Sequence, residues 1–246
     1  MAETDVWNPW HGCRKVSAGC KNCYVYVIDM AYGRNPTHVF KTQAFQLPVK
    51  KNRQGEYKYH QDGYVYTCLT SDFFIEEADE WRQEAWEMMK IRSDLQFYII
   101  TKRIHRFMKC VPADWGDGYP NVTIGCTIEN QQLADERLPI FHDCPIQHKQ
   151  LVCEPLLSDI DFGPYLEDVE GLIVGGESGS RARICRYEWF EHIREQCLKA
   201  ESKPSLWFQQ TGANFEKDGE MLKVPRKQQF TLAHSYELDL IYESGN

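Results

Sequence analysis

The sequence from Trp7 to Tyr24 reads Trp-Asn-Pro-Trp-His-Gly-Cys-Arg-Lys-Val-Ser-Ala-Gly-Cys-Lys-Asn-Cys-Tyr and contains Cys13, Cys20 and Cys23. Two thiolates separated by two residues can reach one metal from a single turn of chain, and the loop before them lets Cys13 fold round to the same centre. Thiolates favour zinc or iron–sulfur clusters. Three thiolates leave one position of a four-coordinate site open, which is typical of sites that carry out chemistry. The stretch therefore predicts a three-cysteine metal site. Two alternatives are a structural zinc site closed by His11 and ordinary core cysteines.

The composition limits the class of protein. The 246 residues contain 42% apolar and 26% charged side chains, enough for a globular core, and the net charge is -8. Proteins that hold duplex DNA mainly through its phosphates are usually basic, so nucleic-acid contact would need a local patch. We find no signal peptide and no apolar run long enough to span a membrane, and therefore expect a cytoplasmic protein, in a bacterial or phage-infected cell. In a reducing cytosol, clustered cysteines indicate metal or catalysis rather than disulfides.

Short apolar segments recur along the chain and alternate with helical patterns. After a brief first strand near residues 6–8, the segments are 64–69, 95–100, 121–126, 150–153, 171–175 and 205–209; the helical patterns are 21–31, 78–89, 131–141 and 189–198. Strands without polar alternation are typical of parallel sheets covered on both faces. We expect an α/β fold, a partial or open (β/α) barrel of about six to seven parallel strands. A flavodoxin-like doubly wound sheet is the competing interpretation.

Polar residues follow these strands where the catalytic loops of (β/α) barrels lie. They are Ser71 and Asp72, Thr101, Lys102 and Arg103, Glu129 and Asn130, Glu154, the run Gly175-Gly176-Glu177, and Gln209 and Gln210. We expect Ser71, Asp72, Lys102, Glu129, Glu154, Gly175, Gly176 and Glu177 to bind a cofactor. The alternative is structural: Asp72 and Asn130 would cap helices, and Lys102 or Arg103 would neutralise Glu154. The glycine run would equally suit substrate binding or a plain tight turn.

The motif W-N-P-x-x-G-C-x-K-x-S-x-G-C-x-x-C-Y resembles the phage-associated three-Cys-motif family, a group of uncertain function regarded as divergent radical S-adenosylmethionine (SAM) proteins. Segments in the family's order support the resemblance: 71–74, 100–103, 121–125, 134–137, 154–157 and 174–179. Typical radical-SAM enzymes space their cysteines by three and then two residues, with an aromatic residue before the last cysteine. This chain has a six-residue spacing, and Asn22 stands in the aromatic position.

The resemblance implies an enzyme in which Cys13, Cys20 and Cys23 hold a [4Fe–4S] cluster and SAM binds the fourth iron. An external electron donor would reduce the cluster, SAM would be cleaved, and hydrogen would be abstracted from a substrate. Within this scheme Lys102 would bind the SAM carboxylate, Glu129 or Glu154 its ribose, and the glycine run its amino group. The group is distantly similar to spore photoproduct lyase, so a nucleotide or nucleic acid is one expected substrate. The alternative function is a phage or mobile-element binding module with a structural three-cysteine metal site.

We expect one domain, residues 1–246, with an insertion at about 34–63 and a C-terminal extension from about 213. The tail is expected to begin with a turn at 217–220 and to end in an antiparallel strand or extended cap. The insertion contains Arg34, Lys41, Lys50, Lys51, Arg53 and Lys58 among aromatic residues. Cations and aromatic rings suit phosphates and stacked bases, so this segment is predicted to cover the cysteine site and to select the substrate. A solvated surface excursion is the alternative.

Overall fold

The computed structural model of the protein describes residues 6–60 and 63–242. The chain forms two compact units. The first unit comprises residues 1–17, 23–125 and 144–148, and the second comprises residues 18–22, 126–143 and 149–246. The expected single domain, with its insertion and extension, stays a prediction; residues 61–62 of the insertion and 243–246 of the extension lie outside the described residues.

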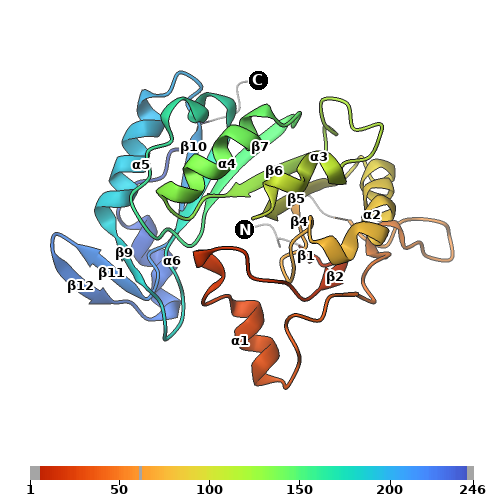
Figure 1. Ribbon diagram of the computed structural model, residues 1–246, viewed down its shortest axis with the longest axis horizontal. Coiled ribbons are helices and arrows are strands. Elements are labelled where there is room, and N and C mark those ends of the chain that lie inside the picture. Colours follow the sequence, from red (N-terminus) through yellow and green to blue (C-terminus); the bar gives the residue numbers. More distant parts are fainter. Residues whose placement is uncertain (1–5, 61–62, 243–246) are drawn as a thin grey trace. The chain divides into compact units, whose positions relative to one another are not determined.

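Seven strands form one open sheet in the order β1-β4-β5-β6-β7-β8-β10 (Figure 1). They are β1 (Val6–Trp7), β4 (Tyr64–Thr67), β5 (Gln96–Thr101), β6 (Val122–Thr127), β7 (His148–Cys153), β8 (Gly171–Gly175) and β10 (Ser205–Gln210). The pairs β1–β4, β4–β5, β7–β8 and β8–β10 are parallel. The predicted α/β class, with a partial, open (β/α) barrel of parallel strands, is confirmed.

The first unit contains β1, β4, β5 and most of β6, with an aromatic core beside them. Its helices are α1 (Tyr24–Ala31), α2 (Asp79–Ile91) and α3 (Phe107–Cys110), with short 3₁₀ turns η2 (Leu47–Val49), η3 (Glu76–Ala78) and η4 (Ile104–Arg106). The rings of Phe73, Trp115 and Tyr119 contact the buried ring of Trp86, and Phe107 contacts Trp115. Large, fully buried aromatic side chains dominate core energetics. Their packing holds α2 in place, and α2 covers most of the helical pattern predicted at 78–89.

A small antiparallel ladder pairs β2 (Trp10–His11) with β3 (Phe40–Lys41) in the first unit. It joins the cysteine-containing loop to the beginning of the predicted insertion. The helix expected at 21–31 begins only at Tyr24, because Cys23 has an extended backbone (ψ 129°) and precedes the first turn. The residues between Cys20 and Cys23 therefore remain outside the helix.

The second unit contains β7 from Lys149 onward, β8, β10 and the helices α4 (Gln131–Asp143), α5 (Tyr187–Lys199) and α6 (Arg226–His234), with η1 (Ala18–Cys20) and η5 (Gly163–Asp168). Asn130 caps α4 as predicted, its side-chain oxygen accepting from Leu133 N at 3.0 Å. A second sheet orders β12 (Glu220–Lys223), β11 (Asn214–Lys217) and β9 (Ile184–Arg186). Phe190 stacks on Phe208 with ring centroids 3.9 Å apart, which joins α5 to β10.

The C-terminal region corrects one expectation and confirms another. The turn predicted at 217–220 joins β11 to β12, with Asp218 and Gly219 at positive φ. The final segment was expected to be a strand or extended cap, but α6 occupies residues 226–234. Its first residues, Arg226 to Gln229, are good helix formers, and this propensity favours a helix over an extended segment. One antiparallel bridge follows, between Leu206 and Leu240.

Candidate metal-binding loop and the strand ends

The backbone around Cys13 is fixed from several sides within the first unit. Cys13 N donates to Pro36 O at 2.8 Å, and the Tyr26 hydroxyl donates to Cys13 O at 2.6 Å. Gly12 has φ +88°, and a side chain there would overlap the backbone of His38, so the loop needs glycine at this position. The Ser71 hydroxyl, which follows β4, donates to the carbonyl of Gly12. Ser71 therefore supports the cysteine loop through its backbone.

A cation lies against the sulfur of Cys13. The Arg103 guanidinium approaches this sulfur at 3.8 Å and donates to Arg14 O at 2.8 Å. Arg103 also forms an ion pair with Asp72 at 3.2 Å. Burial acts to lower the pKa of Arg103, but Asp72 and Cys13 outweigh it and the pKa is raised. Arg103 therefore stays charged, and a positive group beside this sulfur suits a thiolate ligand.

Asp72 organises the end of β5 from the end of β4. Its side chain is only 4% exposed. Its carboxylate accepts from the Thr101 hydroxyl at 2.8 Å and from Lys102 N at 2.9 Å, in addition to the ion pair with Arg103. These contacts bring three predicted strand-end residues together. Asp72 therefore has a structural role in fixing the end of β5. The cofactor-binding roles of Asp72 and Lys102 stay predictions.

Cys23 lies directly before α1 and is partly exposed. The neighbouring Tyr24 hydroxyl donates to Leu69 O at 2.6 Å, which ties the start of α1 to the segment after β4. Within the first unit, Cys13 and Cys23 are thus both fixed near the carboxyl end of β4. This is the end at which (β/α) barrels place their chemistry.

Residues 18–22, which include Cys20, belong to the second unit and contact the segment after β8. The Asn22 amide donates to Glu177 at 3.1 Å and to Arg181 O at 2.8 Å. Arg183 forms an ion pair with Glu177 and donates to Ala18 O at 3.0 Å. Burial alone would raise the pKa of Glu177, but Arg183 and Asn22 hold it below its ordinary value. The predicted carboxylate Glu177 is therefore engaged by protein donors.

The remaining predicted glutamates sit beside glycines of the second unit. A side chain at Gly19 would overlap the carboxylate of Glu129, which is fully buried. A side chain at Gly175 would likewise overlap the carboxylate of Glu154. At Gly176 a side chain would overlap the carbonyl of Thr211. The glycine run is thus needed for close approach of neighbouring groups, so it is more than a tight turn.

The ten cysteines separate by exposure. Cys13 and Cys23 are partly exposed, whereas the other eight, including Cys20, are buried. Burial raises the pKa of Cys68 and Cys153 well above the ordinary value and that of Cys197 to about 12. Thiols that stay protonated are poor metal ligands, because the thiolate is the binding form. These buried cysteines therefore act as small hydrophobic side chains of the core.

His11, the alternative fourth ligand, is held by Asp29 through Nε2 at a distance of 2.7 Å. Asp29 is buried at 1% exposure and lies on α1, so this pair links β2 to α1. Within residues 6–60 and 63–242, no three side chains of His, Cys, Asp or Glu stand together as a group able to hold a metal ion. The donors of the loop fit a soft metal in kind, and their assembly around one centre stays a prediction.

The predicted insertion divides into two parts within the first unit. Its beginning contacts the cysteine loop, through Pro36 and through β3. Its basic part instead lies at the amino end of β5, where the fully buried Arg92 donates to Tyr59 O at 2.8 Å and to Pro48 O. The strand ends that carry Asp72 and Arg103 lie at the opposite end of β5. The expectation that the whole segment covers the cysteine site is therefore wrong for residues 47–59.

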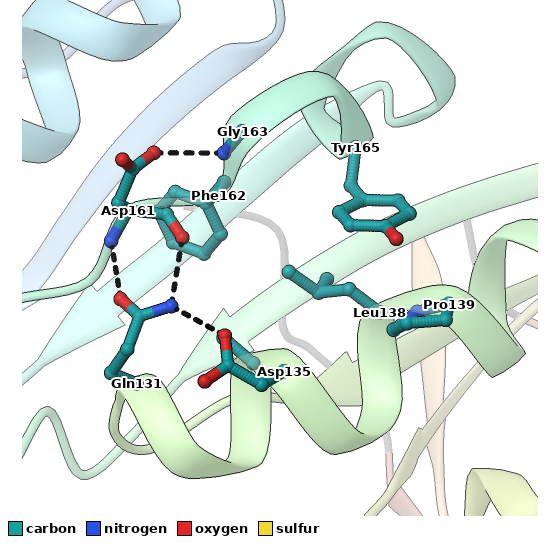
Figure 2. A pocket seen from close by; sticks show the side chains of 9 residues that line it. Gln131, Asp135, Leu138, Pro139, Asp161, Phe162, Gly163 and Tyr165 are labelled. Carbon is teal, nitrogen blue, oxygen red and sulfur yellow. Dashed lines mark hydrogen bonds between the residues drawn. The ribbon is translucent and has the colours of Figure 1, made fainter.

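A groove of about 390 Å³ runs along α4 in the second unit (Figure 2). Gln131 bridges its two sides, donating to Asp135 at 2.8 Å and to Asp161 O at 3.1 Å, while Leu138 and Tyr165 supply apolar surface. None of the predicted site residues and no cysteine lines this groove. The chemistry-bearing residues lie elsewhere, so the groove is not the candidate site.

Residues 2–236 match the model of a family described as a protein of unknown function, DUF5131. The chain belongs to this family. No curated protein and no solved structure matches it significantly. In the part of the chain that the structure describes, no helix is long and apolar enough to cross a membrane.

Three residues at the site have roles that the sequence did not predict. The sequence indicated Arg103 only as a partner of Glu154 and Asn22 only as a departure from the pattern of typical radical-SAM enzymes, and no contact of Arg183 with the cysteine loop was expected. Each acts by contacting a segment distant in sequence. The one available signal was the position of Arg103 directly after a strand.

Proposed function

We propose that Cys13, Cys20 and Cys23 bind an iron–sulfur cluster and that the protein is a radical-SAM enzyme. The observation that carries the proposal is the contact of the Arg103 guanidinium with the Cys13 sulfur at the carboxyl end of the sheet. Arg103 neutralises the buried Asp72 and holds Arg14 O, and the same cation would also stabilise a thiolate at Cys13. Hydrogen bonds to ligand sulfurs are also one means by which proteins set cluster potential.

The chemistry that such a cluster supplies is one-electron reductive cleavage of SAM, with an external protein or chemical donor as the electron source. This chain's residues would hold and orient the groups involved. Lys102 is the candidate for the SAM carboxylate, and Glu129 and Glu154 are the candidates for its ribose. Glu177 is less suited to the SAM amino group than the sequence suggested, because Arg183 and Asn22 already donate to its carboxylate.

For the substrate we propose a nucleotide or a nucleic acid, on the strength of the family resemblance. The basic residues at 50–58 lie at the amino end of β5, so they are better suited to holding a distant part of a long substrate than to contacting the reacting atoms. Phosphate contacts of this kind weaken steeply with salt. Oligonucleotide binding at low salt is therefore the appropriate assay for this part of the proposal.

Anaerobic purification followed by iron, sulfide and zinc analysis tests the proposed function. We expect iron and sulfide in the protein and visible absorbance that dithionite bleaches. Stoichiometric zinc without iron would instead support a structural metal site and the binding-module function. Protein that takes up neither metal after anaerobic reconstitution would contradict the proposal.

A further inference from the structure

The segment after β8 forms hydrogen bonds with residues on both sides of Cys20. We infer that Asn22, Glu177 and Arg183 form an anchor that positions Cys20 for metal binding; its metal-binding aspect rests on the proposed function. Arg183 holds Ala18 on one side of this cysteine, and Glu177 holds Asn22 on the other. All of these residues belong to the second unit.

Glu177 is the centre of the anchor. Its side chain is largely buried, and one carboxylate oxygen accepts from Asn22 Nδ2 at 3.1 Å and from Arg183 Nε and Arg183 N, both at 2.8 Å. The second oxygen accepts from the Arg183 guanidinium. Hydrogen bonds with an ionised partner are stronger than neutral ones. The carboxylate therefore fixes the side chains of both Asn22 and Arg183.

The backbone beneath Glu177 is also fixed. Ala213 N donates to Glu177 O at 2.7 Å, and Gly176 N donates to Gln210 O at 3.0 Å. Gly176 leaves no room for a side chain against Thr211, and Gly212 adopts φ +82°. These contacts connect Glu177 to the end of β10. An anchor on such a supported backbone can hold its partners in one geometry.

These residues hold the short 3₁₀ turn that contains Cys20 through hydrogen bonds at both of its ends. Arg183 Nη1 and Lys21 N both donate to Ala18 O, at 3.0 and 3.1 Å, and Asn22 also donates to Arg181 O at 2.8 Å. The turn is therefore fixed at its first residue, Ala18, and at Asn22, two residues after its last residue. In this arrangement the glycine-glycine-glutamate run positions a ligand-bearing loop, a role distinct from cofactor binding.

Alkylation of metal-free protein tests the anchor without depending on a cluster. Chelator-treated parent, Asn22→Ala and Asn22→Asp proteins are exposed to iodoacetamide, and peptide mass spectrometry follows Cys20, with the fully buried Cys197 as internal reference. We expect Cys20 to react about tenfold faster in Asn22→Ala, since local opening is eased when its hydrogen bonds are lost. Asn22→Asp should react faster still, because its carboxylate faces Glu177.

Glu167→Ala is the matched control. Glu167 also accepts from two backbone groups, Glu201 N and Ser202 N, and both of these donors lie far in sequence from the Cys20 turn. Its alkylation pattern should equal that of the parent. An unchanged Cys20 rate in both Asn22 variants would overturn the anchor, and so would an equal acceleration of Cys197, which would indicate general unfolding.

Cobalt(II) titration supplies the readout that separates positioning from mere stability. The anchor predicts weaker thiolate-to-cobalt absorbance per bound cobalt in the Asn22 variants, and an unchanged spectrum in Glu167→Ala. Equal spectra in all variants would contradict a positioning role for these residues. A parent that binds neither cobalt nor iron would defeat the proposed function, while the alkylation result would still decide whether the anchor exists.

Discussion

The guanidinium of Arg103 lies 3.8 Å from the sulfur of Cys13, ninety residues away in sequence. The same guanidinium pairs with the buried Asp72, which also accepts from Lys102 N. Arg103, which follows β5, and Asp72, which follows β4, thus place one positive charge, the Arg103 guanidinium, in contact with the cysteine loop. This arrangement predicts an electrostatic effect on any metal centre bound through Cys13.

Replacing Arg103 by Gln should lower the reduction potential of the bound cluster by roughly 50 mV, because a tenfold change in a one-electron equilibrium corresponds to about 59 mV. The positive charge favours the reduced, more negative state, and its loss favours the oxidised state. Redox titration followed by electron paramagnetic resonance measures the change. Arg106→Gln is the control, since Arg106, three residues further on, forms ion pairs with Asp79 and Glu76. Equal potentials in parent and Arg103→Gln would refute the effect.

Gly19→Ala should destabilise the protein by about 1–3 kcal/mol, the usual cost of forcing extra atoms into a filled site. The new methyl group would overlap the carboxylate of the buried Glu129. Shortening that side chain should relieve the overlap, so Gly19→Ala combined with Glu129→Ala should lose less than the sum of the two single changes. Urea unfolding of the four proteins measures the coupling. Strictly additive losses would show that the two residues do not meet.

Arg92→Met should destabilise the protein by about 3 kcal/mol and loosen residues 47–59. The change removes hydrogen bonds from a charged group to Tyr59 O and Pro48 O, each of which contributes substantially when buried. Limited proteolysis should cleave this segment faster, while iron content stays at the parent level. Arg53→Met, at an exposed position of the same segment, should change neither property. Loss of iron in Arg92→Met would place this segment closer to the cysteines than the structure does.

Lys102→Ala should weaken SAM binding by about 1.5–3 kcal/mol, the range for a hydrogen bond to a charged group. The expectation depends on Lys102 following β5 directly, with its backbone fixed by Asp72. Calorimetric titration of the reconstituted protein measures it. Lys109→Ala, an exposed lysine seven residues further on, serves as the control and should bind SAM normally. Unchanged affinity in Lys102→Ala would remove this residue from the proposed SAM site.

The sheet could be predicted because each strand is recognisable from its own local sequence. Buried parallel strands such as residues 121–126 and 171–175 are continuous apolar runs, and the predicted positions agree with β6 and β8 to within one or two residues. The helix α6 was not predicted because its amphipathic pattern is weak. The run of good helix formers at its start is also short, about one turn. Local propensity alone seldom decides such short elements.

The candidate site was predictable only in part. The three cysteines are close in sequence, so their spacing identifies them. The contacts of Arg103 with Cys13 and of Glu177 with Asn22 join positions 90 and 155 residues apart, and no local pattern encodes such pairs. Arg92 likewise fixes the basic part of the insertion at the amino end of β5 by donating to Pro48 O, and composition could not indicate this contact.

The most direct test of the central claim is iron content across a set of cysteine variants prepared anaerobically. The triple change of Cys13, Cys20 and Cys23 to Ala should abolish iron and sulfide incorporation, because these are the only cysteines close enough in sequence to converge on one centre without long-range closure. A second triple change, of the buried Cys68, Cys126 and Cys153 to Ala, should retain the parent's iron per folded chain. If the first variant retained iron and the second lost it, the metal would not be bound by Cys13, Cys20 and Cys23.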